Sequence, residues 1–492
     1  MKVTSLHIDE YKLLKDFDIH FNKDISILIG VNGSGKSTIL ECIAQIFSDA
    51  FLKEKAKFGF RLTYELRLEE ILGQTSMTSE FKTEYFAVEI SGKKGEQLTF
   101  KIGDTVVKEN EIIKRYGSFE RILPSNIVIY YSGLSDIMKG ICEPHDDILS
   151  KQFREGNTNA VRPFFYFEPA LFNLVLLSLL SYQYGDIPKF LYERAKIEGV
   201  QSIRINLKKP TWGKGKIDTW WGAKGEVKAL LDYLDSIGQP LKIDENNKSN
   251  GNVVIQAWEN DALIIDIIGQ QKLFEIREYF VEEKTLFKVL NTLLIDGFDP
   301  KVRITFLQDD NEGKRFFNVL SEGEQQSIII RGLVELVNNE NTLFLFDEPD
   351  TYLHPLWQRN FIEDVSQFTT IDELTTSQFL ITTHSPQLLG NADPTNCDVQ
   401  IMEDGEIVKI TPKHYGRDIS SILYEMMGVE SRNKSVAKSL SILFNHIEDE
   451  DLEKSKVEYA KLAELIGEDE PIIIRAKTQL DYLQEAHNEA NH

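Results

Sequence analysis

The stretch Gly30-Val-Asn-Gly-Ser-Gly-Lys-Ser37 lies between an apolar run, residues 25–29, and residues 38–47, where apolar side chains recur with helical spacing. A strand, a glycine loop and a helix in this order are the context in which GxxxxGK[ST] forms a phosphate-binding loop. Glycines allow successive backbone N–H groups to face phosphates, and the helix N-terminus adds its positive end. We therefore expect Lys36 to contact the β and γ phosphates of a nucleotide and Ser37 to contact Mg²⁺. An ordinary glycine-rich turn is the alternative, and the complete pattern argues against it.

A second motif places two carboxylates, Asp347 and Glu348, directly after the apolar residues 343–346 of a predicted strand, residues 342–346. We expect Asp347 to hold Mg²⁺, directly or through water, and Glu348 to orient or deprotonate the attacking water. Acids often end strands, so this pair alone is a moderate signal. In a chain that also carries a phosphate-binding loop it becomes a strong one.

Two further motifs contain few residues but have an informative context. Leu320-Ser-Glu-Gly-Glu-Gln325 opens a predicted helix, and Thr382-Thr-His-Ser-Pro386 follows a predicted strand, residues 378–382. His384 would then lie at the carboxyl edge of a sheet, where ligands bind in α/β proteins. A histidine that is merely packed or exposed is the alternative.

The four motifs in this order resemble the ABC-type ATPase superfamily. Residues 321–325 resemble its signature loop, although Glu322 and Glu324 depart from the transporter pattern LSGGQ. His384 resembles the switch histidine that senses the γ-phosphate, and Asp350 resembles the D-loop position. In that family two heads enclose two nucleotides, so that the phosphate loop of one head faces the signature loop of the other. The resemblance therefore implies an ATP-dependent head-to-head dimer.

The resemblance also implies a set of site residues with ATP and Mg²⁺ as cofactors. The catalytic residues would be Glu348 and His384, and the metal ligands Ser37 and Asp347. The nucleotide contacts would be Gly30, Asn32, Gly33, Ser34, Gly35, Lys36, Ser37, Thr38, Ser321, Gly323, Glu324 and, from the opening segment 8–17, Lys12. The family's Q-loop glutamine has no counterpart, because the expected place reads Ile129-Tyr-Tyr-Ser-Gly133. Tyr131 and Ser132 are the candidates to replace it.

The spacing of the motifs narrows the resemblance. Gly30 and Ser321 are 291 positions apart, and this long separation resembles that of the SMC and RecF-like branch. The sequence shows no long coiled coil, which argues against a true SMC protein. Residues 347–355, DEPDTYLHP, resemble the ATPases of prokaryotic defence systems, including OLD-type proteins. Only 108 residues follow His384, and they show no acid cluster of a Toprim nuclease. The tail segments 415–423, 427–430 and 467–471 resemble PtuA, the nuclease-free ATPase of Septu and retron-associated anti-phage systems.

Composition sets further limits. The chain has 492 residues, of which 42% are hydrophobic, and its net charge is −23. This is a globular composition with material for two or three units, and its charge repels nucleic acid except at a local basic patch. The three cysteines have no CxxC spacing, which favours a reducing cytoplasm over a disulfide framework. No signal peptide is evident, and the longest apolar run, 171–180, is too short to span a bilayer and reads as a buried helix.

The expected fold class is α/β. We expect an ABC-type head, in which a phosphate-loop sheet is joined to an antiparallel β lobe, with a helical and β insertion and a helical C-terminal tail. The predicted division is 1–140 and 301–415 for the two halves of the head, 141–300 for the insertion, and 416–492 for an acidic helical tail.

Residues 204–228 form a basic-aromatic block. They contain seven basic residues and three of the five tryptophans of the chain, with only two acids. Lysines could neutralise phosphates while the indoles stack on unpaired bases, so a DNA contact is one hypothesis. A solubilising edge hairpin with inward-facing tryptophans is the alternative.

The resemblance implies an ATP-binding and ATP-hydrolysing subunit of an anti-phage complex, which dimerises and gates a separate HNH nuclease of the PtuB type. A reverse transcriptase and its msDNA would be additional partners in a retron. The alternative is a RecF- or SMC-like repair ATPase that clamps DNA itself, for which DNA binding by the isolated chain would be the test. The spacing of the motifs weighs against a transporter head, and no membrane partner is expected.

Overall fold

Three of the four motifs lie at the carboxyl ends of strands in one seven-stranded sheet. The computed structural model describes residues 1–75, 78–133, 135–156, 162–238, 253–258, 261–310, 313–317, 319–367, 370–371, 374–375, 377–428 and 432–490. Residues 429 and 430 of the PtuA-like tail segment lie outside these ranges. The chain divides into two units, Met1–Gly416 and Arg417–His492. The finer division of the first unit at 140 and 300 stays a prediction.

The central sheet of the first unit has the order β20-β19-β3-β18-β15-β8-β9, and all its pairings are parallel except that of β20. Its strands are β3 (Ile25–Ile29), β8 (Asn126–Tyr131), β9 (Phe164–Tyr166), β15 (Thr342–Asp347), β18 (Ser377–Thr382), β19 (Cys397–Glu403) and β20 (Glu406–Ile407). Strands β3, β15 and β18 are buried throughout, because a parallel sheet is covered on both faces. The strands predicted from the apolar runs 25–29, 342–346 and 378–382 are confirmed. Strand β18 lies between β3 and β15, so the phosphate loop, the two carboxylates and the histidine motif meet at one edge.

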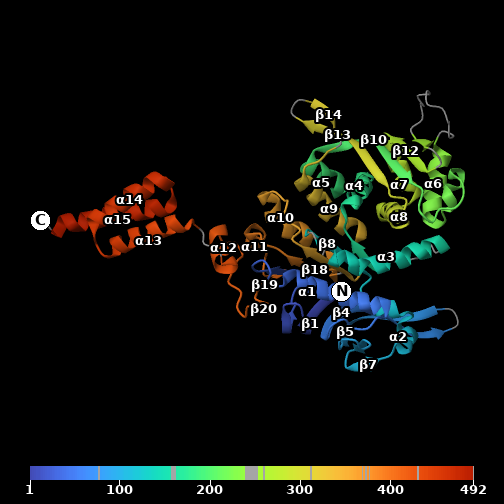
Figure 1. Cartoon of the computed structure of the whole chain (residues 1–492), viewed down its shortest axis with the longest axis horizontal. Coiled ribbons are helices and arrows are strands. Elements are labelled where there is room, and N and C mark those ends of the chain that lie inside the picture. The colour runs from blue at the N-terminus through green and yellow to red at the C-terminus, as the bar shows by residue number, and fades with distance from the viewer. Residues whose placement is uncertain are drawn as a thin grey trace. The chain divides into compact units, whose positions relative to one another are not determined.

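Helix α1 (Lys36–Leu52) follows the phosphate loop and is buried on nearly all sides. It packs between the central sheet and an antiparallel lobe (Figure 1), with which it shares one core. An apolar residue on every face is what a helix in this position requires. The lobe has the strand order β2-β1-β4-β5-β6-β7. Its elements are β1 (Lys2–Tyr11), β2 (Leu14–His20), β4 (Phe60–Thr75), β5 (Thr78–Gly92), β6 (Thr99–Ile102), β7 (Thr105–Val107), α2 (Glu109–Tyr116) and a 3₁₀ turn, Phe119–Ile122.

The insertion contributes helices and three strands to a five-stranded antiparallel sheet of order β11-β12-β10-β13-β14, whose last two strands follow residue 300. The strands of this sheet are β10 (Ile197–Lys208), β11 (Val253–Trp258), β12 (Ala262–Ile268), β13 (Lys301–Asp310) and β14 (Gly313–Phe317). The helices of the insertion are α3 (Ile137–Glu155), α4 (Phe172–Leu180), α5 (Asp186–Ala195), α6 (Gly225–Ile237), α7 (Gln270–Tyr279) and α8 (Glu283–Ile295), with 3₁₀ turns at Pro169–Leu171 and Ile217–Gly222. The apolar run 171–180 is the buried helix α4, as predicted.

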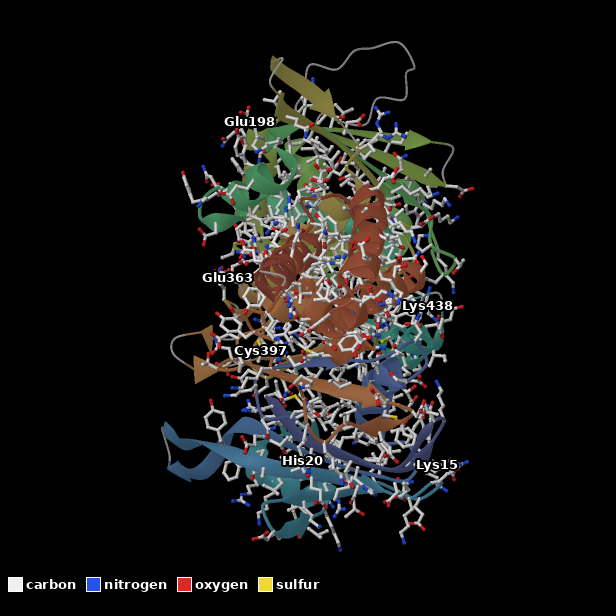
Figure 2. All side chains as sticks on the ribbon, turned by 90° about the vertical axis from the view of Figure 1, so that its left-hand side faces the viewer. Lys15, His20, Glu198, Glu363, Cys397 and Lys438 are labelled. Atoms are coloured by element: carbon white, nitrogen blue, oxygen red, sulfur yellow. The ribbon has the colours of Figure 1, made fainter. Side chains whose placement is uncertain are left out.

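Three further helices follow the signature, carboxylate and histidine motifs: α9 (Glu322–Val337), α10 (Pro355–Ser366) and α11 (Pro386–Gly390). The short strands β16 (Thr370–Ile371) and β17 (Leu374–Thr375) pair with each other. Figure 2 shows the lobe, with Lys15 and His20, at one end of the first unit and the insertion, with Glu198, at the other. Cys397 of the central sheet lies between them.

The second unit is helical, as predicted for residues 416–492. It contains α12 (Ile419–Met427), α13 (Lys434–Glu448), α14 (Leu452–Ile466) and α15 (Pro471–Ala490), the last three of which share a small apolar core. Within the part of the chain that the structure describes, no helix has both the length and the apolar composition needed to cross a bilayer.

The close contact between α9 and α4 depends on Gly332. A Cβ at this position would lie 2.2 Å from Cγ1 of Val175 on α4. We expect Gly332→Ala to lower the free energy of unfolding by about 1–3 kcal/mol, because overpacking a buried contact outweighs the better helix propensity of alanine. Chemical denaturation measures this effect.

Gly140 provides the matched control, because it is an exposed glycine inside helix α3, and among the described residues no atom lies within 4 Å of the point that its Cβ would occupy. Gly140→Ala should leave stability unchanged or raise it by up to about 1 kcal/mol. Equal stability of the two variants would contradict the proposed contact.

Candidate nucleotide-binding site

The phosphate loop has the backbone conformation that its glycines were expected to provide. Gly30 has φ 151°, and a Cβ on it would lie 2.1 Å from the carbonyl oxygen of Met402 on β19. Gly35, with φ 109°, leads directly into α1. The first turn of α1 has no side-chain cap and no acidic residue. Its free amide groups and positive dipole end are therefore left for an anion.

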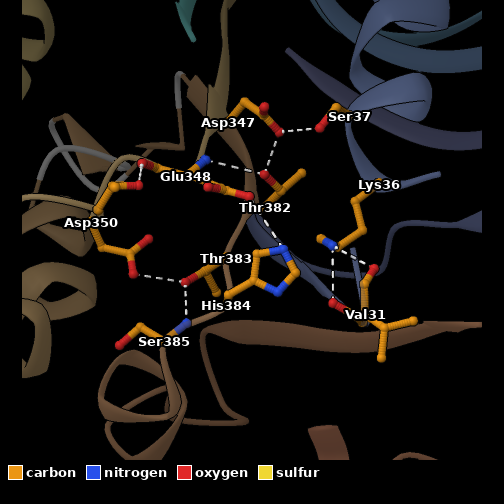
Figure 3. Close-up of polar contacts among 12 residues, drawn as sticks. Val31, Lys36, Ser37, Asp347, Glu348, Asp350, Thr382, Thr383, His384 and Ser385 are labelled. Atoms are coloured by element: carbon orange, nitrogen blue, oxygen red, sulfur yellow. Dashed lines mark hydrogen bonds and ion pairs between the residues drawn. The ribbon is translucent and has the colours of Figure 1, made fainter. Parts of the chain in front are cut away.

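Lys36 reaches back over the loop. Its Nζ donates to the carbonyl oxygens of Gly30, at 3.0 Å, and of Val31, at 3.2 Å (Figure 3). Burial lowers the pKa of the Lys36 ammonium, while the nearby carboxylates of Glu348 and Asp347 act in the opposite direction. Because carbonyl groups are weak partners for a buried cation, a phosphate is a better one.

Asp347 joins the phosphate-loop helix to the histidine strand. Its Oδ1 accepts from the Ser37 hydroxyl at 2.8 Å and from the Thr382 hydroxyl at 2.5 Å (Figure 3). Burial raises the pKa of Asp347, and the two hydroxyl groups oppose this shift. A carboxylate beside a serine hydroxyl is a hard oxygen donor set of the kind that Mg²⁺ shares with nucleotide phosphates. Ser37 and Asp347 therefore fit the metal that the sequence assigned to them.

Glu348 and His384 lie together, half-exposed, at the open side of the cluster. His384 Nε2 is 3.2 Å from Glu348 Oε1. Burial, followed by the charge of Lys36, lowers the pKa of His384 and so favours the neutral imidazole. The backbone of Glu348 has φ 48°, and its N–H donates to both oxygens of Thr382 at 3.1 Å. A left-handed conformation at a non-glycine residue is a cost that is often found at functional sites. Here it aims the carboxylate toward the histidine and the phosphate loop.

Asp350 fastens the loop after Glu348 to the histidine motif. It is 4% exposed, and its Oδ2 accepts from the Thr383 hydroxyl at 2.9 Å. The same hydroxyl oxygen accepts from the N–H of Ser385 at 2.9 Å (Figure 3). Burial raises the pKa of Asp350 to about 6. In this conformation the side chain predicted as a D-loop residue contacts its own chain.

The structure places the candidate Q-loop residues beside Asp347. Tyr131 ends β8 directly opposite Asp347 in the parallel pairing, and the Ser132 N–H donates to the Asp347 carbonyl at 3.3 Å. Burial raises the pKa of Tyr131, with a further contribution from the charge of Asp347. The main chains of both residues therefore lie beside that of Asp347, and which side chain replaces the glutamine stays a prediction.

Lys12 lies in the turn between β1 and β2 and forms an ion pair with Glu41 of α1, with 2.6 Å between Nζ and Oε2. The other oxygen of Glu41 accepts from the Tyr11 hydroxyl at 2.5 Å. Glu41 follows Ser37 by one helical turn, so the ion pair joins Lys12 to the phosphate-loop helix close to Ser37. A direct contact with nucleotide stays a prediction.

The signature loop is separate from this cluster. Ser321 is the N-cap of α9 and forms a reciprocal capping box with Glu324. In the part of the chain described, no hydrogen bond or ion pair connects Ser321, Gly323 or Glu324 with the phosphate loop. The capping box gives a physical reason for the departure from the transporter pattern, since Glu324 caps its own helix.

Two contributors were missed at the sequence level. Thr382 lies within the histidine motif, and its hydroxyl donates to Asp347. Gln326 on α9 donates to the carbonyl of Pro349 and accepts from the N–H of Tyr352 at 3.0 Å. A threonine at the end of a strand next to the carboxylate strand is a usable signal. No local pattern indicates Gln326.

The basic-aromatic block does not form a stacking surface with two of its tryptophans. Trp220 and Trp221 are 5% and 0% exposed, and the Trp220 Nε1 donates to Asp232 at 2.7 Å. Trp212 donates to the carbonyl of Asp296, also at 2.7 Å. The alternative with inward-facing indoles is confirmed for Trp220 and Trp221. The block itself is not a hairpin, since it spans the end of β10, a 3₁₀ turn and the start of α6. Any DNA contact here would depend on the lysines.

The chain is an ATPase whose site and fold resemble those of the ABC-type superfamily. A family model described as "AAA ATPase domain" matches residues 1–162, and one described as "AAA domain, putative AbiEii toxin, Type IV TA system" matches residues 225–390.

The chain is also similar in sequence to three curated proteins. The chain is 23% identical to Retron Ec83 probable ATPase of Escherichia coli, over 86% of this chain and 76% of the relative. It is 25% identical to Retron Vc95 probable ATPase of Vibrio cholerae serotype O1 biovar El Tor, over 83% and 75%. It is 27% identical to Septu protein PtuA of Bacillus thuringiensis, over 37% and 52%. The predicted similarity to PtuA is confirmed.

Proposed function

We propose that this chain is the ATPase subunit of a prokaryotic anti-phage complex. Two copies bind two ATP molecules between their heads, and the nucleotide state gates a separate HNH nuclease. The names of the curated relatives, a Septu protein and two retron ATPases, support the setting. In a retron, a reverse transcriptase with its msDNA would be a further partner.

One observation supports the proposed dimer. The phosphate loop, the predicted Mg²⁺ ligands, Glu348 and His384 lie together within one copy, whereas Ser321 of the signature loop is exposed. Exposed apolar side chains flank that loop: Val319 is 75% exposed, Tyr352 54% and Leu356 57%. A cluster of apolar side chains beside a glycine and an uncharged N-cap is suited to a contact with a second molecule. The γ-phosphate held by the other copy would face Ser321.

The test measures the mass of the purified chain in ATP and in ADP by size-exclusion chromatography with light scattering. We expect a dimer in ATP and a monomer in ADP. Ser321→Asp keeps an N-cap residue type, although it loses the hydroxyl bond to Glu324, and it opposes the γ-phosphate of the other copy. It should weaken ATP-dependent dimerisation at least about tenfold and leave ATP binding by the single copy intact.

The control is Ser420→Asp, which adds the same charge at an exposed serine of α12. It should dimerise like the parent chain. Undiminished dimerisation of Ser321→Asp would contradict the arrangement. Tight, salt-dependent DNA binding by the isolated chain would instead favour the RecF-like alternative.

A further inference from the structure

A cavity of about 400 Å³ lies among helices α3 and α8, the end of α9 and the start of β8. It is separate from the nucleotide site. Asn126, at its wall, begins β8, whereas Tyr131 at the other end of that strand lies beside Asp347. At about 3.3 Å per residue the two ends are about 16 Å apart. Small-molecule sites commonly have volumes of this size.

The charge of the wall is of one sign. Arg162, Lys284 and Lys288 line the cavity, and among the described residues no acidic one does. This is unusual in a chain with a net charge of −23. The Lys284 Nζ donates to the carbonyl oxygen of Asn338 at 2.8 Å, and in the part of the chain described no carboxylate forms an ion pair with it. Asp146 and Glu226 already pair with Arg162 and Lys288. An anion in the cavity would therefore supply the charged partner that Lys284 lacks among the described residues.

Arg162 is held in place by an ion pair that leaves one of its nitrogens without a partner in the part of the chain that is described. Its Nε and Nη2 donate to the two oxygens of Asp146 at 2.8 and 2.7 Å, and its guanidinium lies 4.5 Å from the ring centre of Phe165. These contacts fix the plane of the guanidinium group. Its remaining nitrogen, Nη1, is buried and has no hydrogen-bond partner within the described ranges. A buried donor without an acceptor costs about 1–3 kcal/mol, which a bound acceptor would recover.

The wall also contains an unpaired acceptor and aromatic rings. Asn291 is 6% exposed, and no group in the described part of the chain donates to its Oδ1. Phe153, Phe165 and Phe287 contribute apolar faces to the same cavity. A complementary ligand would therefore carry an anionic group, a hydroxyl or amino donor, and a flat ring.

We propose that this cavity binds a small phosphate monoester that carries a flat ring and hydrogen-bond donors, the chemistry of a nucleoside monophosphate. Arg162 and Lys284 take the phosphate, Asn291 accepts from a sugar hydroxyl or a base amine, and the phenylalanines contact the ring. The ligand is additional to the ATP at the phosphate loop.

The experiment uses the full chain with Lys36→Ala, so that the phosphate loop does not contribute to binding. AMP, GMP, CMP and dTMP are titrated separately by isothermal calorimetry, with inorganic phosphate as a fifth probe. We expect at least one nucleoside monophosphate to saturate one site per chain with a Kd below about 1 mM. Inorganic phosphate should bind at least about tenfold more weakly, because it lacks the ring and the donors.

Two additional substitutions locate the site. Lys284→Gln, at a partly buried side chain, and Asn291→Leu should each weaken binding at least about tenfold. The control, Lys216→Gln, removes the charge of an exposed lysine outside the cavity and should leave the Kd unchanged. Absence of saturable binding by all four nucleotides overturns the proposal. Equal binding in Lys284→Gln and its parent, or equal binding of inorganic phosphate, does so as well.

Discussion

Replacing Lys36 by alanine is expected to reduce the affinity for ATP by at least about 100-fold. The Lys36 ammonium is buried at the phosphate loop, where it bonds the carbonyl oxygens of Gly30 and Val31. ATP offers it charge-assisted hydrogen bonds to phosphate oxygens, each worth about 1.5–3 kcal/mol. Calorimetric titration with ATP and Mg²⁺ measures the loss.

Thermal denaturation separates this loss from misfolding. Without nucleotide, Lys36→Ala should be as stable as the parent or slightly more so, because a buried cation with weak partners is removed. ATP should raise the Tm of the parent chain and not that of the variant, since only binding to the folded state stabilises it. Lys15→Ala, at a lysine of β2 whose side chain is 71% exposed, is the control and should keep the ATP response. A full ATP-induced shift in Lys36→Ala would show that the nucleotide binds elsewhere.

Replacing Glu348 by glutamine is expected to slow ATP turnover by about 10²–10⁴-fold while ATP stays bound. Glutamine keeps the shape of the side chain and can still bond the His384 imidazole 3.2 Å away. It cannot accept a proton from water. The trapped ATP should therefore hold the two copies together and raise the fraction of dimer. Phosphate release, nucleotide content after rapid filtration, and light scattering report the three effects.

The matched substitution is Glu363→Gln on α10, which changes an exposed acid of the first unit (Figure 2). It should leave turnover and ATP occupancy as they are. If Glu348→Gln left both the ATP occupancy and the dimer fraction unchanged, Glu348 would not be the hydrolytic carboxylate.

Much of the site could be predicted because its motifs are local. The phosphate loop, the carboxylate pair and His384 each depend on a few consecutive residues at a strand end, and the parallel sheet brings these ends together. Thr382 could not be assigned with equal ease, because its role depends on β18 being the neighbour of β15. That neighbourhood is a property of the topology and not of any sequence window.

The insertion was harder to predict for the same reason. Its tryptophans read as a stacking surface or as core, and only the packing of Trp221 in the interior decides between these interpretations. The role of Glu324 was equally hard to predict, because the sequence shows only that this residue departs from the family pattern. The capping box with Ser321 shows which local requirement the glutamate meets.

The side chain of Gln326 has a mechanical consequence. It sits one turn into α9, behind Ser321, and holds both Pro349 and Tyr352 on either side of Asp350. Any displacement of the start of α9 is therefore passed to the segment that carries Glu348. If a second copy contacts the start of α9, that contact would shift the position of Glu348. The rates of ATP hydrolysis at the two sites of a dimer would then be coupled.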